Sequence, residues 1–312
     1  MAGPIERATN LLPQLRKNDS RLNYENFTIG FSKAIWGLFK KVVVADTLAI
    51  YVDSAYNLYE YSNGQTLLLA TYLFAFQIYC DFSGYSDMAI GIARMLGYNI
   101  MENFNLPYFS KNVTEFWRRW HISLSSWLRD YLYIPLGGNR NGQFNTYKNL
   151  MITMLLGGLW HGASWNFIIW GFLNGLYLGI ERITKRKNKL ISTEKSIFKK
   201  VVFTFITFNL ICFTWIFFRA QTFEQSQFIV QTIFSPSILD PLTIRDTGVF
   251  GNVIFSLGIL LFFEYTNFRK KTFSSLVKQK KIFTILLFNV VVILMIVLFS
   301  ASSGSQFIYF QF

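Results

Sequence analysis

Long apolar runs separated by short basic segments dominate this chain. A membrane span needs about 20 apolar residues. Five runs without Asp, Glu, Lys or Arg have that length or come close to it: 61–80, 149–180, 201–218, 247–263 and 282–312. The pattern predicts an all-α, polytopic integral membrane protein. Chain length says little about soluble domains in such a protein, so we expect one membrane-embedded helical bundle over residues 1–312.

Two neighbouring stretches are apolar but carry charges. Residues 27–53 suit an interfacial or partly buried helix, because charged side chains interrupt them at Lys33, Lys40, Lys41 and Asp46. Residues 64–80 form a span that ends where the stretch 81–98 begins. This next stretch is rich in glycine, serine and alanine, which allow close helix packing. Its charges either pair with one another or take part in chemistry: Asp81, Asp87 and Arg94.

Residues 103–142 form an amphipathic region rich in tryptophan and arginine. Pro107 and Pro135 bracket one helical pattern, and Thr114 is placed to cap it. On a helical wheel the aromatic and apolar side chains share an arc of about 120°, with His121 at its rim beside Ser125. The helix is too charged to span, so we expect it at the membrane interface or lining a cavity.

Basic loops indicate the orientation. Segments 182–200 and 269–281 are rich in Lys and Arg, which favours the cytoplasmic side for both. The C-terminus is then expected outside. The helices predicted after the first loop are 201–218, 221–234 at the outer surface, 247–267 and 282–301.

The run 149–180 is the most informative stretch. Two complete spans need about 40 residues, and this run is shorter although both of its ends favour the cytoplasmic side. We therefore expect a re-entrant hairpin whose apex, 157–162, does not emerge far on the outer side. The glycines there permit a broken helix, which is tolerated only where protein or a cavity surrounds it. His161 would then lie deep, reached through a polar tunnel.

Composition agrees with a membrane protein. The chain is 52% hydrophobic and 15% charged, against about 25% charged in soluble domains. Its net charge of +13 sits in short loops, where it fixes orientation and meets anionic lipid, so nucleic acid is not an expected partner. Cys80 and Cys212 have no spacing typical of a disulfide or metal site.

Only two histidines occur in the chain, and one lies in the uninterrupted apolar run. A titratable ring at membrane depth favours a functional site, although a packing role for His161 is about equally compatible with residue type alone. A buried neutral imidazole can act as a general base toward a hydroxyl. GxSxG, HExxH, P-loop and CxxC motifs are absent from the sequence. This leaves a histidine-centred transfer reaction, or no chemistry.

Several blocks resemble the membrane-bound O-acyltransferase family, and within it the bacterial branch that O-acetylates alginate. They follow one another along the chain: AGPIERATNLLPQL (2–15), GLFKKVVVAD (37–46), DFSGYSDMAIGIARMLGY (81–98), EFWRRWHISLSSWLRDYLYIPLGGNR (115–140), GGLWHGASWNFIIWG (157–171) and FIYFQF (307–312). Met1 stands directly before the first block, whereas the family has several transmembrane helices there. We therefore expect an N-terminally shortened member that retains the catalytic half.

The resemblance implies a site and a reaction. His161 is the expected catalytic histidine and His121 a second functional histidine. The side chains expected to shape the substrate pocket are Trp117, Trp120, Ser125, Trp160 and Asn166. A transmembrane tunnel would let a cytoplasmic acyl donor, acetyl-CoA, meet an acceptor on the other side. No bound cofactor or metal is expected.

The same resemblance gives a cellular context. It implies a multi-pass protein of the bacterial inner (cytoplasmic) membrane that contacts lipid and works with an extracytoplasmic acetyltransferase- or esterase-like protein. The acceptor is expected to be an exported, alginate-like polysaccharide or cell wall. Three alternatives stay open: D-alanyl transfer to teichoic acid, a channel or transporter, and a non-catalytic scaffold. Internal repeats would favour a transporter, and we find none.

Overall fold

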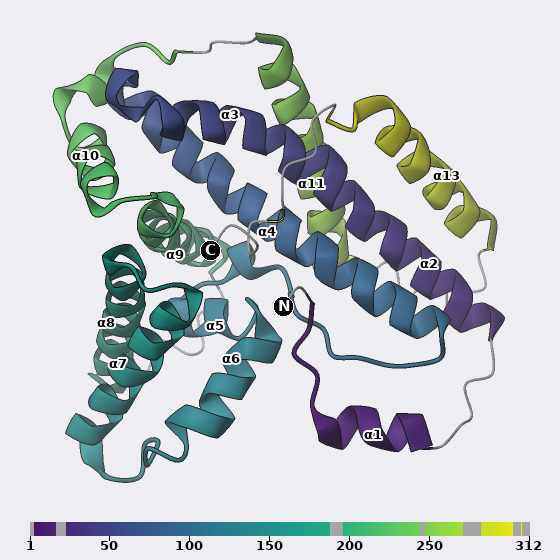
Figure 1. Ribbon diagram of the computed structural model, residues 1–312, viewed down its shortest axis with the longest axis horizontal. Coiled ribbons are helices and arrows are strands. Elements are labelled where there is room, and N and C mark those ends of the chain that lie inside the picture. Colours follow the sequence, from purple (N-terminus) through teal and green to yellow (C-terminus); the bar gives the residue numbers. More distant parts are fainter. Residues whose placement is uncertain are drawn as a thin grey trace. The chain divides into compact units, whose positions relative to one another are not determined.

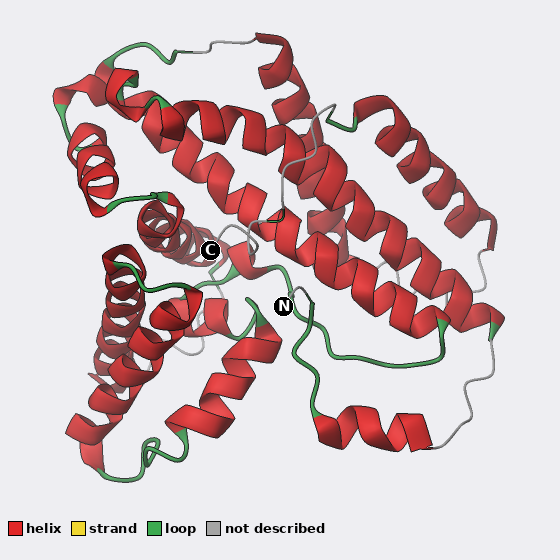
Figure 2. Cartoon of the chain, in the orientation of Figure 1, coloured by secondary structure: helices red, strands yellow, loops and turns green. Residues whose placement is uncertain are grey.

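The computed structural model describes residues 3–16, 23–187, 196–243, 247–270, 282–301 and 307. Within these ranges every regular element is a helix, which confirms the all-α prediction (Figure 2). Two helices are long and apolar enough to cross a membrane: α4 (Gly64–Met95) and α9 (Ile197–Arg219). Two further apolar segments are shorter, Phe250–Thr266 and Phe283–Phe299.

The chain divides into two compact units. The first comprises residues 1–57, 73–103 and 243–311, and the second comprises 58–72, 104–242 and 312. Contacts concentrate within each unit, and the single domain expected over 1–312 stays a prediction.

In the first unit one long helical element lies along α4 (Figure 1). It consists of α2 (Tyr24–Phe39), the π-helix η1 (Lys40–Ala45) and α3 (Asp46–Asn57), which follow one another without a loop. This element confirms the helix predicted over 27–53. Around it pack α11 (Thr247–Lys270), against α3 and η1, and α13 (Ile282–Phe299), against α2. The unit also contains α1 (Ala8–Arg16).

The predicted end of a helix at Asp81 is wrong, because α4 continues to Met95. The charge of Asp81 does not have to reach water: its carboxylate lies 2.8 Å from the ammonium of Lys41. Asp81 and Asp87 therefore pair with lysines of the neighbouring helix. The predicted small-residue packing is confirmed on the same face, where Gly84 and Gly91 meet α2.

Glycines set the distance between α2 and α4. Gly37 and Gly84 face each other, so that a Cβ added to Gly84 would lie 2.7 Å from the Gly37 carbonyl oxygen. Gly30 and Gly91 repeat the arrangement seven residues away on each helix. Such pairs allow two backbones to approach more closely than any side chain permits.

Replacing Gly84 by alanine is expected to destabilise the first unit by about 1–3 kcal/mol, because the added methyl group meets backbone that cannot move aside. Thermal unfolding of the detergent-solubilised protein measures the effect. Gly251 of α11 provides the matched control, since a Cβ there has open space within 4 Å. Gly251→Ala should be neutral or slightly stabilising. Equal effects of the two substitutions would contradict the packing role of Gly84.

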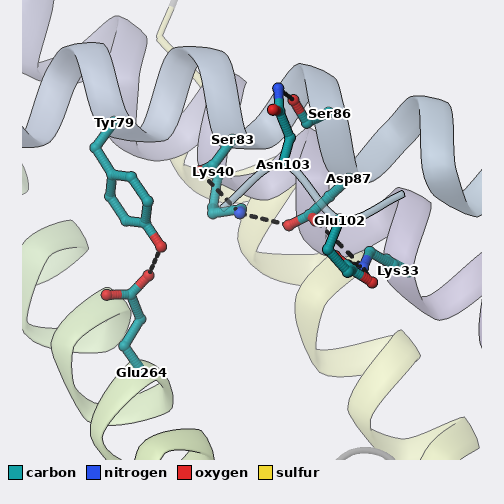
Figure 3. A network of polar contacts seen from close by, with 9 residues as sticks. All are labelled: Lys33, Lys40, Tyr79, Ser83, Ser86, Asp87, Glu102, Asn103 and Glu264. Carbon is teal, nitrogen blue, oxygen red and sulfur yellow. Dashed lines mark hydrogen bonds and ion pairs between the residues drawn. The ribbon is translucent and has the colours of Figure 1, made fainter. Parts of the chain in front are cut away.

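Buried charges connect α2, η1 and α4 (Figure 3). The Lys40 ammonium lies 2.5 Å from the Asp87 carboxylate and 2.9 Å from the Ser83 hydroxyl. Lys33 pairs with Glu102 at 2.5 Å and lies 3.6 Å from Asp87. These contacts fix how the long helical element lies along α4.

The second unit is built around a helical hairpin and a third helix. The hairpin consists of α7 (Gly142–His161) and α8 (Trp165–Lys187), and α9 packs on α8 (Figure 1). Before the hairpin come α5 (Val113–Trp117), α6 (Ile122–Leu128) and the π-helix η4 (Arg129–Tyr133). After α9 comes α10 (Phe223–Ile233).

The two antiparallel helices of the predicted hairpin are present, and their re-entrant placement in a membrane stays a prediction. The predicted broken-helix apex is wrong. Helix α7 continues through Gly157 and Gly158 to His161, and the turn follows at 162–164. Glycines allow the two helices to pack closely. A Cβ added to Gly158 of α7 would clash with the Phe167 carbonyl oxygen, and a Cβ added to Gly171 of α8 would lie 2.5 Å from the Met154 carbonyl oxygen.

The later helices agree with the sequence. Helices predicted over 201–218, 221–234, 247–267 and 282–301 correspond to α9, α10, α11 and α13. The prediction of orientation stays open, because much of both basic loops lies outside the described residues, at 188–195 and 271–281. Of the ending FIYFQF, only Phe307 is described.

Candidate functional site

His161 ends α7 inside a group of aromatic rings. Its side chain is 9% exposed. Ring centroids lie 5.4 Å away at Trp170 of α8, 5.0 Å away at Phe218 of α9 and 6.1 Å away at Phe167. The close packing of α7 on α8, and of α8 on α9, therefore brings three helices to one imidazole. We call His161, Trp170, Phe167 and Phe218 the aromatic cluster.

His121 lies at a break between two short helices. The continuous helix predicted between Pro107 and Pro135 is wrong, because α5 ends at Trp117 and α6 begins at Ile122. His121 has φ 41° and ψ 55°, a left-handed conformation that residues other than glycine rarely adopt. Such backbone geometry persists only where the surroundings impose it, and it often accompanies function. The helical wheel therefore does not describe where His121 points.

Local hydrogen bonds hold this break. The Ser125 hydroxyl donates to the Trp120 carbonyl at 3.0 Å.

The cap of α5 is Asn112 rather than the predicted Thr114: the Asn112 side chain accepts from the Glu115 N–H at 2.8 Å. The Thr114 N–H instead donates to the Glu181 carboxylate of α8 at 2.9 Å, which ties α5 to the hairpin.

The fold brings the two histidines together. His121 is 3% exposed, and its Nδ1 lies 3.4 Å from the Ser123 hydroxyl. Burial lowers the pKa of His121 to about 3, and the nearby His161 contributes to the decrease. His121 is therefore neutral at physiological pH. Two buried imidazoles from two successive quoted blocks, 115–140 and 157–171, thus lie near enough to influence each other.

Lowering the pH is expected to destabilise the protein through His121. The pKa falls from 6.5 to about 3 on burial, so the unfolded chain takes up the proton first as the pH drops. The free energy of unfolding is unaffected by this proton above about pH 6.5 and decreases as the pH falls toward 3. At pH 5 the decrease amounts to about 2 kcal/mol. Thermal unfolding in detergent across this range measures the slope. His121→Asn, which cannot titrate, should make the slope shallower by the share of His121, while the buried His161 keeps its own share. An unchanged slope would contradict a neutral buried His121.

The tryptophans predicted for the substrate pocket have different environments. Trp117 contacts Trp170 with ring centroids 5.7 Å apart, and its indole N–H donates to Asn174 at 3.3 Å. Trp120 is buried among Phe104, Phe116 and Trp215. Trp160 is 53% exposed and meets the His161 ring edge-on at 4.9 Å. Trp117 and Trp160 thus adjoin the aromatic cluster, whereas Trp120 lies in the core.

Asn166 and Ser125 have structural partners. The Asn166 amide donates to the carbonyls of Ala220 and Thr222, at 2.9 and 3.0 Å, and accepts from the Ser226 hydroxyl at 3.0 Å. These bonds join the start of α8 to the connection between α9 and α10. Their part in substrate binding stays a prediction.

Sequence reasoning missed Trp170, Phe218 and Phe167. Trp170 lies inside the quoted block 157–171, but nothing in its spacing marks it, because contact with His161 requires the antiparallel return of α8. Phe218 comes from α9, 57 residues after His161 in the sequence. A cluster of three or more side chains that could hold a metal ion is not found among the described residues.

Similar proteins match more than half of the chain. It is 53% identical over 182 residues to a protein of Pseudomonas putida named probable alginate O-acetylase, covering 58% of this chain and 37% of the relative. It is 42% identical over 229 residues to a peptidoglycan O-acetyltransferase of Helicobacter pylori, covering 72% of this chain and 42% of that relative. It is 28% identical over 218 residues to a teichoic acid D-alanyltransferase of Bacillus subtilis, covering 65% of this chain and 55% of that relative.

These alignments cover about a third to just over half of each relative's length. A family model described as MBOAT, membrane-bound O-acyltransferase family, matches residues 1–221. The match includes both histidines and all of α2 to α8. Because it covers more than half of the chain, this protein belongs to the membrane-bound O-acyltransferase family.

Proposed function

We propose that this protein is a membrane O-acetyltransferase that delivers acetyl groups for O-acetylation of an exported polysaccharide or of cell wall. The observation that carries the proposal is the buried pair of histidines, in which His161 is enclosed by aromatic rings and His121 is held beside it. Both lie in the part of the chain that matches the acyltransferase family.

His161 serves as the general base. Its imidazole takes the proton of the attacking hydroxyl, and the hydroxyl oxygen forms a bond to the acyl carbon of an acetyl thioester. As the carbon–sulfur bond breaks, the leaving thiolate takes up the proton from the imidazolium. His121 positions or polarises the reactants. A neutral ring suits this role, because a fixed positive charge beside His161 would oppose its protonation.

The membrane setting follows from the family and the apolar helices. We place the protein in the bacterial cytoplasmic membrane as a multi-pass protein, with the hairpin α7–α8 and the helices 113–133 around a tunnel. Acetyl-CoA on the cytoplasmic side is the proposed donor. An extracytoplasmic acetyltransferase- or esterase-like protein is the proposed partner that passes the acetyl group to the polymer.

A second candidate is D-alanyl transfer to teichoic acid. It is favoured by the similarity to a teichoic acid D-alanyltransferase at 28% identity. The higher identities to the alginate and peptidoglycan enzymes, 53% and 42%, favour acetyl transfer.

Deletion of the gene, with complementation by the intact coding region, tests the proposal. Mild base releases both acetate and D-alanine from envelope polymers, and the two can be quantified separately. We expect the deletion to remove esterified acetate and leave D-alanine unchanged. Loss of D-alanine alone would support the second candidate. Retention of both would overturn the acyltransferase proposal.

A further inference from the structure

The indole N–H of Trp170 is a buried donor beside the proposed catalytic histidine. Trp170 is 3% exposed, and its Nε1 has no hydrogen-bond acceptor among the described residues. Its ring lies nearly perpendicular to that of His161, with an interplanar angle of 85° and centroids 5.4 Å apart. The donor therefore belongs to a side chain in direct contact with the imidazole.

This donor lacks the kind of acceptor that the neighbouring Trp117 has. Buried tryptophan N–H groups normally find an acceptor, because leaving one unsatisfied costs about 1–3 kcal/mol. The adjacent Trp117 follows the rule by donating to the Asn174 side chain at 3.3 Å. Asn174 in turn donates to the Trp170 carbonyl at 2.8 Å, so it secures the Trp170 backbone but not the indole.

The rest of the Trp170 ring is fixed by packing. It contacts Trp117, Trp215 and Phe218 at centroid distances of 5.7, 6.1 and 5.6 Å. A phenylalanine would supply most of this apolar area without an unsatisfied donor. Burying the indole nitrogen thus has a free-energy cost, and none of the described residues supplies an acceptor that offsets it.

We propose that Trp170 is a positioning and charge-stabilising residue whose indole N–H donates a hydrogen bond to the carbonyl oxygen of the acyl group at His161. This inference rests on the proposed acyl transfer. When the hydroxyl oxygen bonds to the acyl carbon, the carbonyl oxygen gains negative charge. A donor already in place in a water-poor site stabilises that charge. The oxygen's electron pair then re-forms the carbonyl double bond, the carbon–sulfur bond breaks, and the negative charge leaves on the thiolate.

The test separates the N–H group from the shape of the ring. Trp170→Phe removes the donor and part of the ring. Replacement of Trp170 by 3-benzothienylalanine keeps the bicyclic shape and exchanges only the N–H for sulfur. Each variant of the intact protein is assayed in native membrane vesicles with labelled acetyl-CoA, as the initial rate of ester formation on envelope polymer. Saturating and limiting donor concentrations separate kcat from KM.

We expect the benzothienyl variant to lose about 100-fold in kcat with little change in KM, the order of effect seen when one oxyanion donor is removed. Its thermal unfolding temperature should be unchanged or higher, since an unsatisfied donor is gone. The matched control is the same replacement at Trp36, which packs on Phe39 and Phe263 of the first unit at 4.9 and 5.0 Å. That variant should keep the wild-type rate.

Two results would overturn the inference. One is a benzothienyl variant with the wild-type kcat, and the other is a loss of rate that only follows a loss of folded protein. Failure of the proposed function looks different: wild-type protein would then form no ester, or His161→Ala would form as much as wild type.

Discussion

Replacing His161 by alanine is expected to lower acetyl ester formation at least about 100-fold while the protein still accumulates in the membrane. Loss of a general base typically costs about 10²–10⁴-fold in rate. The effect should be large because the imidazole is buried among aromatic rings, where water cannot easily replace it as a base. Cell-surface acetyl ester content, normalised to the amount of protein in the membrane, measures the loss.

Destabilisation needs its own control in this experiment. Ile229 of α10 is fully buried in the same unit as His161. Ile229→Ala should cost about 2–5 kcal/mol through the cavity it leaves, yet it removes no reacting group. Near-normal ester content per molecule of Ile229→Ala, together with its loss in His161→Ala, would assign the effect to chemistry. Unchanged ester in His161→Ala at normal protein level would refute the catalytic assignment.

Breaking the buried ion pair of the first unit is expected to have the largest effect on stability. Asp87 accepts from Lys40, whose side chain is only 4% exposed, and also lies near Lys33 (Figure 3). Asp87→Ala leaves the Lys40 ammonium buried without its carboxylate, which typically costs about 3–5 kcal/mol. Thermal unfolding in detergent should show a lower midpoint, or the protein should fail to accumulate.

Two further variants distinguish burial of charge from other causes. In Lys40→Met combined with Asp87→Leu, both charges are removed and apolar area replaces them, so much of the stability should return. Asp130→Asn breaks the exposed pair with Arg129, where the side chains are 37% and 63% exposed. Such pairs contribute about 0–1 kcal/mol. If Asp87→Ala were as mild as Asp130→Asn, the buried pair would not hold η1 on α4.

The sequence predicted the helices well where one apolar run makes one element. Helices α9, α11 and α13 match their runs closely, because apolar length and flanking charge decide them. The prediction failed at Asp81. In the sequence its charge indicates the end of a helix, because the partner that neutralises it, Lys41, lies 40 residues away. Ion pairing between distant segments is not visible in a local pattern.

The candidate site was predicted in part. Both histidines were identified from their rarity and from the quoted motifs, and the structure places them together. The helical wheel could not place His121, because it assumes a continuous helix and the chain breaks there with φ 41°. Trp170 and Phe218 were missed for a related reason: they reach His161 only through the packing of α8 and α9.

Glycine was the most ambiguous signal. In 81–98 it correctly indicated close packing, and Gly84 and Gly91 do contact α2. In 157–162 it was interpreted as a helix break, yet Gly158 lies inside α7 and lets α8 approach. The same residue type serves both purposes, and only the facing helix decides which one applies.

The most direct test follows a labelled acetyl group across the membrane. Sealed vesicles prepared from cells are given labelled acetyl-CoA on the cytoplasmic face only, and labelled ester is measured on the opposite face for wild type and His161→Ala. The account predicts ester on the opposite face with wild-type protein and background levels with His161→Ala at equal protein content. Equal labelling by the two proteins, or none by either, would contradict it.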